Sequence, residues 1–237
     1  MTLPAGRPPF RVAVLVHGGF WSMPWDAGLM APAARDLAQR GVAVWNLEYR
    51  RLGEPGAGWP GTFTDVLAGF AALAGLPEVE VLDLSSVAVA GHSAGGHLAL
   101  WLAAERKAYG GGRPAVSAVA ALAAVTDLRL CWEQDAGGGA VRHLLGGSPS
   151  RYAERYRAVS PIERLPLGIP QLLVSGRRDR MVPPGFSIRY GDAAAAAGDD
   201  VTVLLFERTG HMDVINPGKK AWRTAAAWMI GRPEPAL

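Results

Sequence analysis

The sequence predicts an α/β fold, a three-layer α/β/α sandwich in which helices cover both faces of a mostly parallel sheet. Short apolar runs, separated by stretches with helical character, lead to this prediction. Runs of this length without polar alternation are typical of strands that are buried on both faces. They are RVAVLV (11–16), VAVWNL (42–47), VAVAG (87–91), VSAVAAL (116–122), QLLVS (171–175) and VTVLLF (201–206).

Helix-compatible stretches separate these runs, and strand–helix–strand order of this kind is typical of a parallel sheet. Gly41 follows the first stretch and is a typical helix stop. The stretch 127–170 is rich in glycine and proline, so we expect an irregular segment with short helices that partly covers a site. The predicted helices span residues 28–40, 62–75, 94–108, 185–197 and 219–231.

Length and composition predict one domain over residues 1–237, with flexible ends at about 1–10 and 232–237. A content of 49% hydrophobic and 19% charged residues suits a folded core. The net charge of +3 comes without a long basic run, so we expect no nucleic-acid partner. Neither a signal peptide nor a bilayer-spanning stretch is apparent, which predicts a cytoplasmic protein without membrane contact. Composition does not separate a monomer from a homodimer.

A serine between very small residues is the first candidate for chemistry. GHSAG at 91–95 fits the pattern G-x-S-x-G and lies between a predicted strand and a predicted helix. In this setting a sharp turn lifts Ser93 above the sheet, and the small neighbours prevent a clash with its strained backbone. The N–H of Ala94 begins the helix and is a candidate oxyanion donor. The alternatives are an incidental serine in a glycine-rich turn, or a phosphate loop that would need glycine at 93.

The segment HGGFW at 17–21 follows the first strand, where a second set of oxyanion donors is expected. Glycines let the backbone turn its N–H groups inward, so Gly19 and Phe20 are the predicted donors. We expect His17 to hold this loop by a local hydrogen bond. The histidines beside the serine, His92 and His97, are expected to be structural.

The predicted acid is Asp179, in GRRDRMVP after the fifth strand, and the predicted base is His211, in TGHMDV after the last. A carboxylate at the first position can orient an imidazole at the second. With Ser93, the chain order is nucleophile, acid, base, as in hydrolases of this strand–turn–helix type. The rival acid is Asp127, and the rival base is His143, which precedes the acid.

Neither a metal nor a cofactor is expected, because five histidines and one cysteine are scattered without metal-binding spacing. Aromatic residues on predicted loops supply candidates for the walls of a substrate pocket. The alternative is that they pack in the core. The candidates are Trp21, Trp25, Trp59 and Trp132.

Together, HGGFW, GHSAGGHLAL, GRRDRMVP and GHMDVINP resemble the α/β-hydrolase superfamily of serine hydrolases, over about residues 10 to 230. The HGGxW pattern resembles kynurenine formamidases (arylformamidases). It is also similar to the HGGG loop of esterases and lipases, and to small hydrolases of the prolyl-oligopeptidase type. The resemblance implies a triad of Ser93, Asp179 and His211, with oxyanion roles for Gly19, Phe20 and Ala94.

The sequence differs from the usual α/β-hydrolase pattern in two respects. Relatives usually carry strands before the HGG strand, whereas about ten residues precede it here, which predicts either a minimal fold with a shortened N-terminal sheet edge or a natural chain that begins earlier. No large lid is apparent, which favours small or accessible substrates. We expect a serine hydrolase that cleaves a small ester or amide, as a carboxylesterase or a formamidase, before a small peptidase. A non-catalytic small-molecule-binding protein is the alternative of another class.

Overall fold

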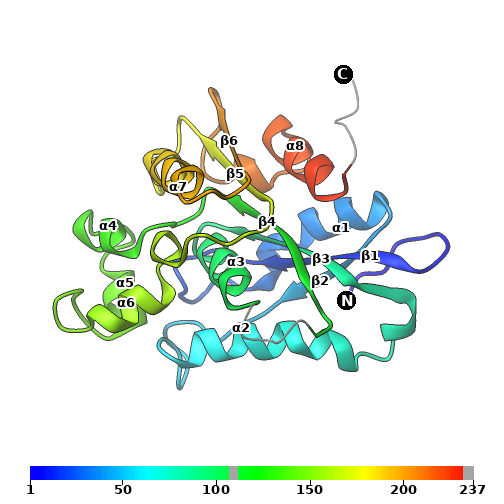
Figure 1. Ribbon diagram of the computed structural model, residues 1–237, viewed down its shortest axis with the longest axis horizontal. Coiled ribbons are helices and arrows are strands. Elements are labelled where there is room, and N and C mark those ends of the chain that lie inside the picture. Colours follow the sequence, from blue (N-terminus) through cyan, green and yellow to red (C-terminus); the bar gives the residue numbers. More distant parts are fainter. Residues whose placement is uncertain (107–111, 232–237) are drawn as a thin grey trace.

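In the part of the chain that the structure describes, six parallel strands form one sheet in the order β2–β1–β3–β4–β5–β6, with helices on both faces (Figure 1). The computed structural model describes residues 1–106 and 112–231. The three-layer α/β/α architecture predicted from the apolar runs is therefore confirmed. The strands are β1 (Phe10–Val16), β2 (Val42–Leu47), β3 (Leu82–His92), β4 (Val116–Leu122), β5 (Gln171–Gly176) and β6 (Val201–Phe206).

The helices follow the predicted stretches, with ends that local residues explain. Asp26 accepts a hydrogen bond from Gly28 N and caps a short 3-10 turn, so α1 itself begins only at Ala31. The last two residues of the predicted helix 94–108 lie outside the described part of the chain. The helices are α1 (Ala31–Gln39), α2 (Gly61–Ala71), α3 (Ala94–Glu105), α4 (Leu128–Glu133), α5 (Ala140–Leu145), α6 (Ala153–Val159), α7 (Gly185–Ala196) and α8 (Lys220–Met229).

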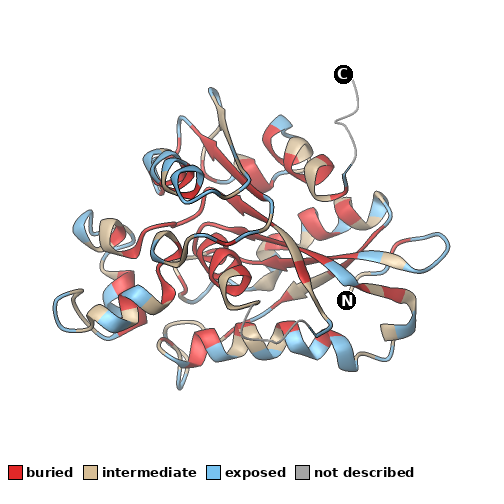
Figure 2. Ribbon diagram, in the orientation of Figure 1, coloured by how far each residue is buried: buried red, intermediate tan, exposed pale blue. Residues whose placement is uncertain are grey.

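Two cores form because successive strand residues point to opposite faces of the sheet. In β1, Val12, Val14 and Val16 join the core under α2, α3 and α7, whereas Ala13 and Leu15 join the core under α1 and α8. Figure 2 shows burial along the strands and on the inward faces of the helices, with exposed outer faces. Burial on both sides explains why the strands appear in the sequence as continuous apolar runs.

Strand β3 begins five residues before the predicted run, and the reason is a break in its register with β1. Asp83 pairs with Arg11, but the next pair joins Val87 to Val12, so Leu84, Ser85 and Ser86 bulge out of the ladder. The apolar pattern therefore marks only the regular half of this strand.

The sequence predicts flexible ends at about residues 1–10 and 232–237. Thr2 exchanges two backbone hydrogen bonds of 2.8 Å with Val44, so the first residues are held against the edge strand β2. The predicted flexible end at 232–237 lies outside the described residues.

The irregular segment after β4 carries three short helices, α4, α5 and α6, as the sequence predicts. They lie together at one end of the molecule, beyond the carboxyl end of β4 (Figure 1). The backbone of Trp59 donates a hydrogen bond of 2.7 Å to Leu144 O, which ties this segment to the loop after β2. Among the described residues, no helix is long and apolar enough to cross a membrane.

Glycines allow the start of α3 to approach the strands beneath it. A Cβ on Gly91 would lie 2.1 Å from Gly95 O, and a Cβ on Gly96 would lie 2.5 Å from the Cβ of Ala124. A Cβ on Gly95 would lie 2.2 Å from Val16 O and 2.3 Å from His17 O. Side chains at these positions would push the helix away from β1 and β3.

Gly95→Ala is therefore expected to destabilise the fold by about 3 kcal/mol or more, because backbone carbonyls cannot move independently of the sheet. Urea unfolding measures the change. Gly185→Ala is the matched control at the start of α7, where an added Cβ meets nothing within 4 Å, and its stability should stay within about 1 kcal/mol of wild type. An unchanged unfolding midpoint for Gly95→Ala would contradict the close approach.

Candidate active site

Ser93 occupies the sharp turn between β3 and α3, in a conformation that L-residues rarely adopt. Its φ is 55° and its ψ is −118°. Ser93 N donates a hydrogen bond of 2.8 Å to Leu122 O, and Ser93 O accepts one of 3.1 Å from His97 N. Because strained backbone persists only where its surroundings hold it, these bonds fix the place of the serine above the sheet.

His211 and Asp179 meet although 32 positions separate them in the sequence. His211 Nδ1 lies 2.7 Å from Asp179 Oδ2, and both side chains are almost fully buried. The other carboxylate oxygen, Asp179 Oδ1, accepts hydrogen bonds of 2.9 Å from the N–H groups of Met181 and Val182. With Nδ1–H donating to the carboxylate, Nε2 of His211 is left unprotonated and available as a base.

The rival acid and base lie in other settings. Asp127 caps α4, since its Oδ1 accepts hydrogen bonds of 3.0 Å from the backbone N–H groups of Arg129 and Leu130. Its Oδ2 lies 3.1 Å from Nε of Arg189. His143 is exposed on α5. The structure therefore brings Asp179, not Asp127, to an imidazole.

The HGGFW loop lies directly against the serine turn. A Cβ on Gly18 would lie 3.1 Å from the Cβ of Ser93. Gly19, Phe20 and Trp21 follow with φ values of 108°, 48° and 56°, so three successive residues have left-handed backbone. Among the described backbone hydrogen bonds, none uses the N–H of Gly19 or Phe20 as a donor.

Ala94 supplies a third candidate N–H group because it is the first residue of α3. The first N–H groups of a helix have no acceptor inside the helix, and the helix dipole favours negative charge there. The HGGFW loop and the start of α3 thus both supply candidate backbone donors next to Ser93. Such a set can stabilise the oxyanion of a tetrahedral intermediate.

His92 has a closer relation to the base than the sequence suggests. Its Nε2–H donates a hydrogen bond of 3.0 Å to the carbonyl of His211, and the two rings lie 4.6 Å apart. Burial and the neighbouring His211 lower the pKa of His92 to about 3, so its ring is neutral at pH 7. His92 therefore joins the nucleophile turn to the loop of the base.

His97 has the structural role predicted for it. Its Nδ1 accepts a hydrogen bond of 3.1 Å from the indole of Trp21, and its Nε2–H donates one of 2.9 Å to Val159 O. Burial lowers the pKa of His97 to about 4. Both ring nitrogens are satisfied in the neutral form, and the fully buried His97 supports the HGGFW loop through Trp21.

The four candidate pocket tryptophans have different surroundings. Trp21 is fully buried and donates its indole N–H to His97, so it belongs to the core and does not line an open pocket. Trp25 is 50% exposed and packs against Gly19. Trp59 packs on Phe63 with ring centroids 5.5 Å apart. Trp132 lies under Arg142 and lines a cavity of about 150 Å³ between α4 and α5.

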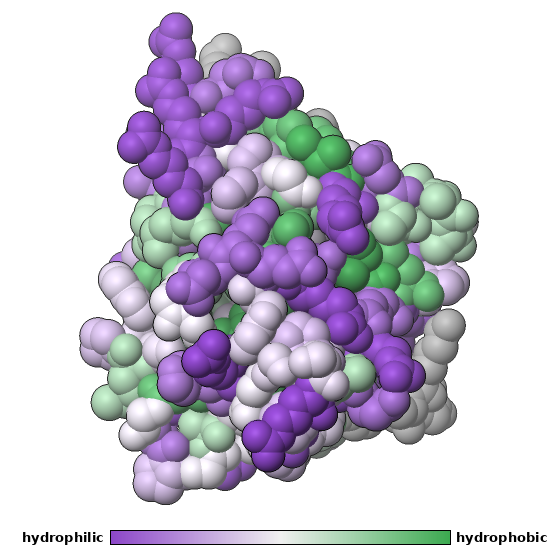
Figure 3. Space-filling view, turned by 90° about the vertical axis from the view of Figure 1, so that its left-hand side faces the viewer, coloured by the Kyte–Doolittle hydropathy of each residue, from purple (hydrophilic) through white to green (hydrophobic). Residues whose placement is uncertain are grey.

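Exposed apolar side chains occur close in sequence to the candidate site. Trp25 follows the HGGFW loop, Met181 follows Asp179 by two residues, and Met212 follows His211. Figure 3 views the end of the molecule that carries α4, α5 and α6, and shows apolar patches between hydrophilic side chains. A cavity of about 580 Å³ lies elsewhere, at the amino-terminal ends of β1, β3 and β4, and none of its lining residues is a predicted site residue.

Sequence reasoning missed Glu48, which follows β2 directly. Its Oε1 lies 2.7 Å from Nε2 of His17, the first residue of the HGGFW loop. Burial raises the pKa of Glu48, but hydrogen bonds from His17 and Ala27 and the charge of His17 outweigh it and lower the pKa to about 2. The available signal was the charged run EYRR, at the carboxyl end of the strand beside β1.

Solved structures share this fold across nearly the whole chain. A bifunctional GH43-CE protein of Bacteroides eggerthii matches with 20% identity and a TM-score of 0.84 over 97% of this chain. The chain spans only 32% of that protein's length. Esterase B of Lactobacillus rhamnosis matches with 24% identity, a TM-score of 0.79, and coverage of 97% of this chain and 77% of that chain.

A bacterial heroin esterase also matches, with 23% identity, a TM-score of 0.77, and coverage of 97% of this chain and 76% of that chain. At these identities the likeness shows the fold, which is the α/β-hydrolase type shared by these esterases. The BD-FAE family model matches residues 2–191, so the chain belongs to the BD-FAE family. A search of curated protein sequences finds no match.

The neutral, buried histidines predict that stability falls with acidity. An unfolded histidine has a pKa of about 6.5, whereas the pKa of His97 in the fold is about 4. From pH 6.5 to pH 4 the unfolded chain binds a proton that the folded chain does not, so the free energy of unfolding should fall by up to about 1.4 kcal/mol per pH unit for this ring.

Urea unfolding at pH 7, 6 and 5 measures this slope. His97→Gln should flatten it, whatever its effect on stability at pH 7, because the variant has no ring at 97 to protonate. His143→Gln, which replaces an exposed histidine, should keep the wild-type slope. Equal slopes in wild type and His97→Gln would contradict the assignment of His97 as a buried neutral ring.

Proposed function

We propose that the protein is a serine esterase that cleaves a small carboxylic ester through an acyl-enzyme on Ser93. The hydrogen bond of 2.7 Å between His211 and Asp179 carries this proposal, because it joins two loops in the tautomer that a general base needs. The strained Ser93 and the adjacent loop with unused N–H groups support it. Membership of the BD-FAE family and the fold shared with esterases agree with this chemistry.

The reaction has two steps, and His211 moves a proton in each. Nε2 of His211 takes the proton of Ser93 Oγ while the oxygen attacks the ester carbonyl. The tetrahedral intermediate collapses, and the alcohol leaves with the proton from His211. A water molecule then attacks the acyl-enzyme with the same histidine as base, which releases the acid and restores Ser93.

Charge develops at two points, and this chain has a group for each. Asp179 stabilises the imidazolium that His211 becomes after it takes the proton. The carbonyl oxygen becomes an oxyanion, which the backbone N–H groups near the serine would bind. We assign these donors to Gly19, Phe20 and Ala94.

The side chains around the candidate site indicate which acyl and alcohol groups the substrate carries. Exposed Trp25, Met181 and Met212 around the candidate site favour a substrate with an apolar or aromatic group. Formamide hydrolysis remains a second candidate on the HGGFW motif alone, and the small peptidase is the third.

A comparison of rates tests the substrate class. We expect p-nitrophenyl acetate and butyrate to be cleaved with higher kcat/KM than N-formyl-kynurenine or an aminoacyl-anilide. Faster cleavage of N-formyl-kynurenine would replace the esterase by a formamidase. Failure to cleave any of the four would leave the fold and withdraw the substrate class.

Ser93→Ala is expected to lower kcat/KM by more than about 10⁴-fold, because the covalent step is lost. A fluorophosphonate probe should label wild type and not the variant. Ser85→Ala, which replaces an exposed serine on β3, should keep both activity and labelling. Near-wild-type activity in Ser93→Ala, or no labelling of wild type, would favour a binding protein on this scaffold.

Asp179→Asn separates the two candidate acids. The amide cannot stabilise the imidazolium or hold the correct tautomer, so kcat should fall by about 10³- to 10⁴-fold. Asp127→Asn still caps α4, since asparagine is also a good cap, and kcat should stay within a few-fold of wild type. Steady-state kinetics on the same ester measures both. The reverse order would assign the acid to Asp127.

A further inference from the structure

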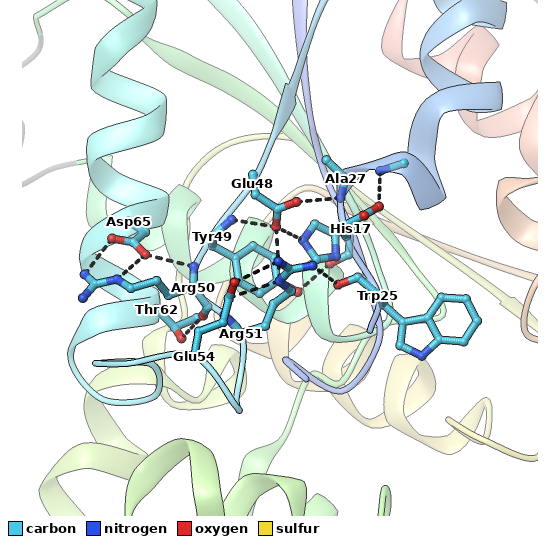
Figure 4. Close-up of polar contacts among 12 residues, drawn as sticks. His17, Trp25, Ala27, Glu48, Tyr49, Arg50, Arg51, Glu54, Thr62 and Asp65 are labelled. Atoms are coloured by element: carbon cyan, nitrogen blue, oxygen red, sulfur yellow. Dashed lines mark hydrogen bonds and ion pairs between the residues drawn. The ribbon is translucent and has the colours of Figure 1, made fainter. Parts of the chain in front are cut away.

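The residues directly after β2 bind the HGGFW loop at several points. We call Glu48–Leu52 the clamp segment and His17–Trp25 the oxyanion loop. Figure 4 shows Glu48 and Tyr49 beside His17 and Arg51 beside Trp25, whereas Arg50 of the same segment points toward Asp65 on α2. These contacts join two loops that lie about thirty positions apart in the sequence.

The Glu48 carboxylate accepts hydrogen bonds from three residues. Oε1 accepts hydrogen bonds of 2.7 Å from His17 Nε2 and 3.1 Å from Tyr49 N. Oε2 accepts one of 2.9 Å from Ala27 N, in the 3-10 turn that follows the oxyanion loop. One carboxylate therefore holds both the start of this loop and the residue just beyond its end.

The clamp segment contacts the ring, the Nε2 atom and the carbonyl oxygen of His17. The ring is fully buried and stacks on Tyr49 with centroids 4.2 Å apart and an interplanar angle of 6°. Nδ1 faces Gly18 O at 2.9 Å, and the Tyr49 hydroxyl donates a hydrogen bond of 2.9 Å to His17 O. The two ring nitrogens therefore face two oxygen atoms, Gly18 O and Glu48 Oε1.

The far end of the oxyanion loop is held in the same way. Arg51 Nη1 donates a hydrogen bond of 3.0 Å to Trp25 O, and the Arg51 guanidinium is itself bound by Glu54. Leu52 N donates a hydrogen bond of 2.6 Å to Trp21 O, and Leu52 O accepts one of 3.2 Å from Met23 N. The strained residues 19–21 thus lie between two fixed ends.

This arrangement matters because left-handed backbone at Phe20 and Trp21 is unfavourable without outside support. A loop released at His17 would turn toward ordinary φ values and carry the N–H groups of Gly19 and Phe20 away from the serine. We propose that Glu48 is a positioning residue, which holds these oxyanion donors in place through its hydrogen bond with His17. The proposal rests on the proposed esterase function for its effect on rate, but not for its effect on the loop.

Glu48→Gln tests the proposal because an amide keeps the size of the side chain and removes its charge. Both carboxylate oxygens of Glu48 accept hydrogen bonds, whereas the amide nitrogen of glutamine cannot accept one. At least one of the three hydrogen bonds is therefore lost. We expect kcat on p-nitrophenyl acetate to fall by about 10- to 100-fold with KM within about two-fold, because the lost interaction acts on the transition state.

Asp65→Asn is the matched control. Asp65 binds the same clamp segment, since it accepts hydrogen bonds of 2.9 Å from Arg50 N and 2.7 Å from Arg50 Nε. No described contact joins Asp65 to the oxyanion loop. We expect kcat and KM of this variant to stay near wild type, although its melting temperature falls. An equal loss of kcat in both variants would assign Glu48 a general structural role and overturn the proposal.

Amide hydrogen exchange of residues 17–25 tests the restraint without any substrate. Exchange should become faster in Glu48→Gln and stay at the wild-type rate in Asp65→Asn. Wild type that cleaves no ester, together with this exchange pattern, would remove the esterase function and keep the restraint. Unchanged exchange in Glu48→Gln would overturn the proposal whatever the activity.

Tyr49→Phe is the second variant, for the case in which Glu48→Gln does not fold. It keeps the ring that stacks on His17 and removes only the hydroxyl that binds His17 O. We expect a several-fold loss of kcat at constant KM, and faster exchange of the same residues. A Tyr49→Phe enzyme with wild-type kcat and wild-type exchange would contradict the proposed clamp.

Discussion

The close contact between the start of α3 and the end of β1 is the constraint on which the candidate site depends. A Cβ on Gly95 would lie 2.2 Å from Val16 O, and a Cβ on Gly18 would lie 3.1 Å from the Cβ of Ser93. Only glycine permits both approaches, because any side chain would separate helix from strand. The serine turn and the HGGFW loop therefore adjoin as a direct result of backbone packing.

Buried polar groups extend this contact into a connected site. His92 binds the backbone of His211, Asp179 binds the His211 ring, and His97 binds the indole of Trp21. Each polar group would cost free energy if it were buried alone, and each reduces that cost through a partner on another loop. The loops at the carboxyl ends of β1, β3, β5 and β6 are in this way fixed relative to one another.

The short helices α4, α5 and α6 lie next to the loops of the candidate site. A Cβ on Gly137, which lies between α4 and α5, would lie 2.4 Å from the ring of Phe20, so this segment adjoins the oxyanion loop. Loops carried by a fixed scaffold are where related proteins differ in specificity. The substrate preference of this protein is accordingly expected to depend on α4–α6 and on the exposed tryptophan and methionines, rather than on the sheet.

The sequence by itself determined the strands, their parallel arrangement and the candidate triad, because buried parallel strands leave continuous apolar runs and chemical groups follow them in a fixed order. It favoured Asp179 over Asp127 by chain order and loop setting, and the position of the His211 ring, beside Asp179 and not Asp127, comes only from the tertiary structure. It could not place Trp21 in the core, or join Glu48 to His17. Those contacts join the loop after β1 to Glu48 after β2 and to His97 on α3, all distant in sequence, so only the tertiary structure brings them together.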